Sequence, residues 1–167
     1  MRFEHLIQIN DLTNRLIPPL TRDEVWAGLM QRVEDPCAFL PGLEQCHIIE
    51  RNITGIRRRL DFGTATIEDH VTLEDGIWVR FNILPNTGHA AGSLTIAIES
   101  PQEDSLFLRF TYQTHFDQGS NSEDQAYSEY VKSAYHQSDI DTVRIIRSLS
   151  AARKTPQRPE SVSGRRK

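Results

Sequence analysis

The sequence lacks the features that mark many common enzymes and membrane proteins. It contains no glycine-rich phosphate loop, no paired metal-ligand motif and no serine in a nucleophile elbow. No stretch approaches the roughly 20 apolar residues that a membrane helix needs. The N-terminus alternates polar with apolar residues and has neither the apolar core nor the cleavage site of a signal peptide. We therefore expect a cytoplasmic protein that does not insert into a membrane.

Cysteine is scarce as well. Cys37 and Cys46 are the only two, and without an export signal a disulfide between them is not expected. Together with His47 they fit no standard zinc motif, because their spacing is wrong and a fourth ligand is missing. We expect two ordinary buried thiols, no metal site and no cofactor.

Length and charge predict one folded body and a tail. The 167 residues, 38% hydrophobic and 25% charged, suit a single soluble domain with room for a cavity. Residues 153–167 hold six basic residues and one acid, so they carry +5 and residues 1–152 carry −9 of the net −4. An acidic body argues against binding of nucleic acid. We expect one domain over 1–152 and a basic, disordered tail over 153–167.

Hydrophobic periodicity predicts a strand, two short helices, six strands and a long helix. The first strand covers 3–9, and a helix follows over 21–33 with a capping box from Thr21 to Glu24. Asp35 and Pro36 then begin a second, short helix. The later strands are expected near 44–52, 56–62, 65–73, 77–84, 93–100 and 105–115, and the last helix over 122–152.

The long helix carries an interrupted apolar stripe. Its apolar members are Tyr127, Val131, Ala134, Tyr135, Ile145 and Leu149, flanked by Tyr130 and Ile146. Between the two halves, the same stripe carries Ser138, Asp141 and Thr142. We expect the middle of the inner face of this helix to be polar, unless a local break at 136–141 turns these residues elsewhere.

This order of elements predicts an α+β fold in which a seven-stranded antiparallel sheet curves around the long C-terminal helix. The segments "FEHLIQIN", "PPLTRDEVWAGL", "DPCAFLPGL", "AAGSLTIAIESP", "LFLRFTY" and "AYHQSDIDTVRIIRSL" resemble successive blocks of the AtaL-like family, a branch of the START and birch-pollen-allergen (SRPBCC) superfamily. The resemblance covers residues 3 to about 150. It implies a helix-grip fold with an apolar cavity between sheet and helix, and it supplies no catalytic residues.

Two charges interrupt an apolar strand face in "GIRRRLDFGTATIEDHVTL". If the loop is centred on Gly63 and Thr64 with an even number of residues, Arg58 lies directly opposite Asp69 on the inner face. One interpretation is a structural ion pair near the cavity wall. The other is that Arg58 offers its planar donor fork to an anionic group of a ligand, while Asp69 orients it.

The next hairpin contains a conflict. Asp75-Gly76 is typical of a two-residue turn, which would turn Arg80 and Asn82 inward. The apolar pattern instead places Ile77, Val79, Phe81 and Ile83 inside, which requires an odd loop or a bulge. We favour the apolar pattern, because the register must satisfy burial along the whole strand.

Five further residues are candidates for ligand contact. His5 could act as a general base, although a core histidine satisfied by a hydrogen bond is the simpler interpretation. Tyr112 and Tyr135 would bring a ring and a hydroxyl to the cavity. Phe81 and Phe110 lie on inward strand faces and complete the predicted set with Arg58 and Asp69.

Three functions compete. The first is a carrier or sensor that binds a small hydrophobic or amphipathic molecule. The second is an enzyme of the polyketide cyclase or aromatase kind, in which the cavity folds a reactive polyketone. The third is a structural or partner-binding subunit, for which a homodimer with a closed cavity would be the sign. A cavity larger than roughly 300 Å³ would suit the first two.

Overall fold

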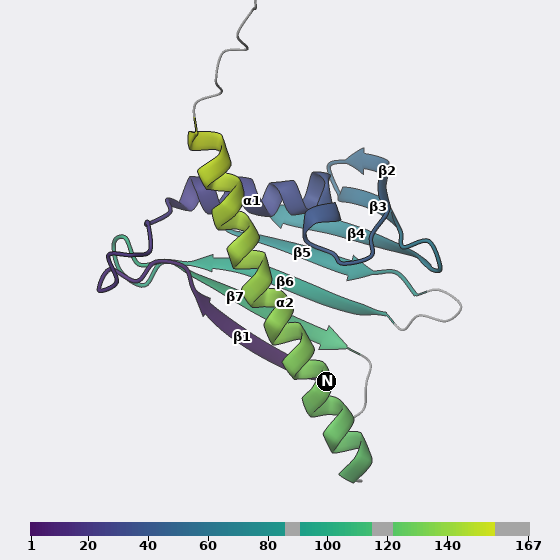
Figure 1. Cartoon of the computed structure of the whole chain (residues 1–167). Helices are drawn as coiled ribbons and strands as arrows, with labels where there is room; N and C mark the ends of the chain where they lie inside the picture. The colour runs from purple at the N-terminus through teal and green to yellow at the C-terminus, as the bar shows by residue number, and fades with distance from the viewer. Residues whose placement is uncertain (86–90, 115–121, 156–167) are drawn as a thin grey trace, which may run out of the picture.

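The computed structural model describes the whole chain apart from residues 86–90, 115–121 and 156–167 (Figure 1). Most of the segment between the strands predicted over 77–84 and 93–100, and most of the predicted tail, therefore lie outside the described residues. The elements are β1 (Arg2–Gln8), α1 (Arg22–Glu34), the 3-10 turn η1 (Pro36–Ala38), β2 (Gln45–Asn52), β3 (Gly55–Asp61), β4 (Thr66–Glu74), β5 (Trp78–Ile83), β6 (Gly92–Glu99), β7 (Phe107–Thr114) and α2 (Ser122–Lys154). None of the helices in the described residues is long and apolar enough to cross a membrane.

The strands form one antiparallel sheet in the order β1-β7-β6-β5-β4-β3-β2. Sequential strands from β2 to β7 pair as a meander, and β1 joins the free edge of β7. Figure 1 shows α2 running diagonally across one face of the curved sheet, with α1 beside it. This arrangement confirms the predicted α+β helix-grip fold.

Both predicted hairpin registers are confirmed. In β3 and β4, Arg58 pairs with Asp69, and the backbone N–H of Phe62 donates to the carbonyl of Ala65 at 2.8 Å. In β4 and β5, Val71 pairs with Phe81, so the apolar pattern decides the register. The loop holds three residues between Glu74 and Trp78, with Gly76 in the left-handed region at φ 74°.

One residue of the second hairpin was predicted on the wrong side. Ile77, expected inside, is 46% exposed because it belongs to the three-residue loop rather than to β5. Arg80 and Asn82 lie on the opposite face of β5 from buried Val79 and Phe81, as the favoured register requires.

Helix α1 begins and packs as its sequence predicts. The backbone N–H of Glu24 donates to Thr21 Oγ1 at 3.1 Å, which is half of the expected capping box. Val25, Leu29 and Val33 are almost completely buried. The second predicted helix is a single 3-10 turn, with Pro36 in its first position.

The middle of the inner face of α2 is polar as predicted, and Thr142 is 1% exposed. The prediction is wrong for Asp141, which is half exposed and pairs with Arg144, while its neighbour Asp139 is 1% exposed. Tyr135, Ile145 and Leu149 of the predicted stripe pack against the core, but the most buried face of the helix lies beside this stripe. Tyr127 and Tyr130 are exposed, because α2, with 33 residues or about 50 Å, extends beyond the sheet (Figure 1).

Both cysteine thiols are free. The described residues contain no cluster of side chains that could hold a metal ion. The prediction that both are buried is wrong, because Cys37 is exposed and Cys46 is partly exposed. Cys37 lies in η1, where a single turn covers little of its own surface.

Candidate ligand-binding cavity

A cavity of about 220 Å³ lies between the concave face of the sheet and the helices. Strands β3 to β7 supply most of its wall, and α1, η1 and α2 close it. The residues that line it are Arg32, Pro36, Leu40, Arg58, Leu60, Phe62, Ile67, Asp69, Phe81, Ile83, Gly92, Ser93, Leu94, Tyr112, Gln113, Thr114, Tyr135 and Ser138. The cavity is smaller than the roughly 300 Å³ that would suit a carrier or a cyclase, so its volume favours neither function and suits only a small molecule.

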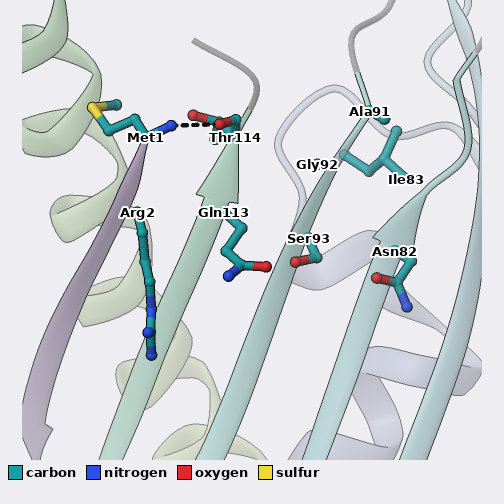
Figure 2. A pocket seen from close by; sticks show the side chains of 9 residues that line it. All are labelled: Met1, Arg2, Asn82, Ile83, Ala91, Gly92, Ser93, Gln113 and Thr114. Atoms are coloured by element: carbon teal, nitrogen blue, oxygen red, sulfur yellow. Dashed lines mark hydrogen bonds between the residues drawn. The ribbon is translucent and has the colours of Figure 1, made fainter. Parts of the chain in front are cut away.

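A second, more open hollow of about 480 Å³ lies at the ends of the strands on the outer face of the sheet, the face opposite to the cavity. Figure 2 shows Arg2, Gln113, Ser93 and Asn82 side by side on β1, β7, β6 and β5 in this hollow. The N-terminal ammonium of Met1 donates to the carbonyl of Thr114 at 2.6 Å at its edge. Ile83, Gly92, Ser93, Gln113 and Thr114 line both spaces, because these strand residues lie in the part of the sheet that separates the hollow from the cavity.

Arg58 is almost fully committed to protein partners. Its Nε and Nη2 donate to the two carboxylate oxygens of Asp69 at 2.9 and 2.5 Å. Its Nη1 donates to the backbone carbonyls of Arg32 and Val33 at 3.0 and 2.9 Å. Of the five N–H groups of a guanidinium, only one on Nη2 lacks such a bond with the described residues. Arg58 and Asp69 are each 2% exposed, which favours a structural ion pair.

A second guanidinium, that of Arg32, borders the same cavity and was not predicted. Arg32 is 8% exposed, and its Nη1 donates to Thr142 Oγ1 at 2.8 Å. Its Cζ atom lies 5.4 Å from the ring centre of Phe81 and 5.9 Å from that of Phe39. Burial lowers the pKa of this guanidinium, because the charged form is poorly solvated.

Tyr112, Asp139 and His5 form a hydrogen-bonded chain behind the cavity wall. The Tyr112 hydroxyl donates to one carboxylate oxygen of Asp139, and His5 Nδ1 lies 2.7 Å from the other. Burial raises the pKa of Asp139, and burial followed by the Asp139 charge raises that of Tyr112. The tyrosine therefore stays protonated, and Asp139 holds a proton more readily than an exposed aspartate.

Aromatic rings surround this chain. The rings of Tyr112 and Tyr135 stack with centres 4.5 Å apart, and Phe3 stacks on Tyr112 at 4.9 Å. The His5 ring lies 4.7 Å from that of His136. Tyr112 and Tyr135 thus present their rings to the cavity, while the hydroxyl of Tyr112 is bound behind it.

The structure brings five of the seven predicted residues together on the cavity wall. These are Arg58, Asp69, Phe81, Tyr112 and Tyr135. His5 lies one step behind the wall, bonded to Asp139 as a satisfied core histidine, and Phe110 is fully buried in the core. Arg32 and Asp139 were missed. Arg32 follows Val25 and Leu29 at helical spacing, and Asp139 precedes Val143 and Ile146, so both interrupt apolar stripes.

The curved sheet and the long helix with a cavity between them define a helix-grip protein, and solved structures agree. The di-domain aromatase/cyclase StfQ of the steffimycin biosynthetic pathway matches with a TM-score of 0.68 and 11% identity over 91% of this chain and 51% of that one. The chain thus spans about half of that protein. ZhuI aromatase/cyclase from Streptomyces sp. R1128 matches with a TM-score of 0.60 and 14% identity, over 92% of this chain and 94% of that one. Norcoclaurine synthase from Thalictrum flavum, in complex with dopamine and hydroxybenzaldehyde, matches with a TM-score of 0.59 and 15% identity, over 93% of this chain and 89% of that one.

The family follows from the sequence itself. Residues 7–153 match the family model described as acetylaranotin biosynthesis cluster protein L, AtaL. The chain therefore belongs to the AtaL family. No curated protein matches the sequence.

Proposed function

We propose that this protein binds a small, mostly apolar molecule in the cavity between the sheet and α2, and acts as its carrier or sensor. The observation that carries the proposal is a partly open cavity with a mostly apolar wall and a few convergent polar groups. Leu60, Ile67 and Leu94 supply apolar surface. The polar end of the ligand would lie on the side of Arg58 and Asp69, although their ion pair leaves only one N–H on Nη2 of Arg58 for it. A core evolved only for stability would be filled by side chains.

Native mass spectrometry of protein purified from cells tests this proposal. We expect the wild-type chain to retain a small molecule, and Leu94→Trp to lose it because the indole fills the cavity. Thr95→Trp is the matched control, since Thr95 is the next residue of β6 and lies on the outer face, where its hydroxyl accepts from Arg80 Nε at 2.9 Å. A ligand retained equally by both variants, or absent from all three proteins, would contradict the proposal.

An enzyme of the polyketide cyclase or aromatase kind is the alternative. The chain of Tyr112, Asp139 and His5 favours it, because a buried carboxyl between a phenol and an imidazole can hold and move a proton. Aromatase/cyclases are also among the solved structures with this fold. Incubation with a polyketone separates the two functions: a carrier returns the molecule unchanged, whereas a cyclase returns a cyclised product that has lost water.

A further inference from the structure

Arg32 carries a buried positive charge with which no carboxylate of the described residues forms an ion pair. Among the described residues, its guanidinium makes one hydrogen bond, from Nη1 to Thr142 Oγ1 at 2.8 Å, and no ion pair. The Thr142 hydroxyl donates in turn to the carbonyl of Ser138 at 3.0 Å, so it serves Arg32 only as a neutral acceptor. The Nε and Nη2 atoms of Arg32 have no hydrogen bond with the described residues, although Arg32 lines the cavity.

Two carboxylates, Asp69 and Asp139, act on Arg32 through their charge, but both already bond to other side chains. Asp69 receives both of its bonds from Arg58. Asp139 is bonded to Tyr112 and His5, and its effect on Arg32 acts at a distance rather than through an ion pair. The positive charge of Arg32 is therefore incompletely neutralised.

An arginine in this position lowers the stability of the folded state. A guanidinium stays protonated in proteins, and a buried charge without a counterion is unfavourable. The ring faces of Phe81 and Phe39 offset part of this cost through cation-π contact. A methionine would fill similar space without a charge, so stability alone gives no reason for arginine here.

We propose that Arg32 binds an anionic oxygen group of the ligand, and that the ligand is a single-ring carboxylate or a molecule of similar size and charge. This inference rests on the proposed function of the cavity. The unpaired Nε and Nη2 donors suit the two oxygens of a carboxylate. An apolar cavity of about 150 Å³ accommodates benzene, so 220 Å³ has room for one substituted ring.

The test compares benzoate with benzamide, which has the same shape and no charge. By titration calorimetry at pH 7, we expect the wild-type protein to prefer benzoate. In Arg32→Met, benzoate affinity should fall by about tenfold or more, because a charge-assisted hydrogen bond is lost, while benzamide affinity changes little. Arg22→Met is the matched control on the same helix, because Arg22 bonds the carbonyl of Gly76 and does not line the cavity.

Thermal unfolding supplies a readout that a merely structural arginine would not give. Without ligand, Arg32→Met should be at least as stable as the wild type, since an unpaired buried charge is removed. Benzoate should raise the Tm of the wild type and leave that of the variant unchanged. If Arg32→Met does not fold, Arg32→Lys keeps the charge without the planar fork, and should bind benzoate with reduced affinity and reduced preference over benzamide.

The outcomes separate this inference from the proposed function. An unchanged preference for benzoate in Arg32→Met, or an equal loss of both probes, overturns the role of Arg32 and leaves cavity binding intact. If neither probe binds the wild type although it retains a cell-derived molecule that Leu94→Trp loses, the ligand class is wrong and the carrier proposal stands. If no molecule is retained and no probe binds, both fail.

Discussion

Asp69→Asn isolates the charge of Arg58 while leaving the shape of the site nearly unchanged. Arg58 and Asp69 are each 2% exposed, and two hydrogen bonds of 2.9 and 2.5 Å join them. In the variant, the guanidinium keeps the two carbonyl bonds from Nη1 but has no counterion. Breaking a buried pair in this way costs about 3–5 kcal/mol, which corresponds to a fall in Tm of about 6–20 °C for a domain of this size.

Urea unfolding, followed by circular dichroism, measures this loss directly. Glu68→Gln is the matched control, since Glu68 is the adjacent residue of β4 and pairs with Arg57 of β3 at 2.7 Å. The side chains of Arg57 and Glu68 are 46% and 29% exposed, so removal of this charge should cost less than about 1 kcal/mol. An Asp69→Asn loss as small as the Glu68→Gln loss would refute the reasoning.

A double replacement separates the charge from the packing. Arg58→Met with Asp69→Leu removes both charges and retains volume, so we expect stability equal to that of the wild type or higher by about 1–4 kcal/mol. The single variants should each be strongly destabilised, which gives a large coupling energy. If the double variant is as unstable as the singles, the carbonyl bonds from Nη1 rather than the ion pair hold the structure.

Two further predictions concern the helices. Because burial raises the pKa of Asp139, its contribution to stability is full below the ordinary value of 3.8 and is lost as pH rises through the folded pKa. As pH rises through this range, the wild type should therefore lose stability relative to Asp139→Asn. Unfolding measured at several pH values tests this, and a gain in the relative stability of the wild type would contradict it. Gly28→Ala places a Cβ 2.7 Å from two carbons of Ile146, so it should cost about 1–3 kcal/mol. In urea unfolding, this loss should shrink in an Ile146→Ala background, which removes both of these carbons, and an equal loss in both backgrounds would refute the clash.

The sheet could be predicted from the sequence because strand periodicity leaves little freedom. Successive side chains of a strand point to opposite faces, so only one orientation of β3 and β4 buries their apolar residues. That orientation places Arg58 and Asp69 on the inner face, opposite each other. In β4 and β5, the Asp75-Gly76 signal and the burial pattern disagreed, and burial decided the register. The packing of the whole strand therefore sets the register, and the residues of the turn decide only which loop conformation joins the strands in that register.

The inner face of a helix is less well determined by its own sequence. Each residue turns by 100°, so two adjacent stripes of α2 look similarly amphipathic, and only contact with the sheet selects Asp139 over Asp141. Arg32 was missed for another reason. A long charged side chain near the end of a helix is usually solvated, and nothing within α1 reveals that η1 and α2 cover this one.

The two arginines are linked through the backbone of α1. Arg58 donates to the carbonyls of Arg32 and Val33, two of the last four carbonyls of the helix, which have no partner within it. A positive charge at a helix C-terminus is also favoured by the helix dipole. The ion pair with Asp69 therefore fixes the end of α1, and with it the position from which Arg32 reaches the cavity. Replacing Arg58 alone, which leaves Asp69 buried without its partner, should impair both stability and anion binding, whereas replacing Arg32 should impair binding alone.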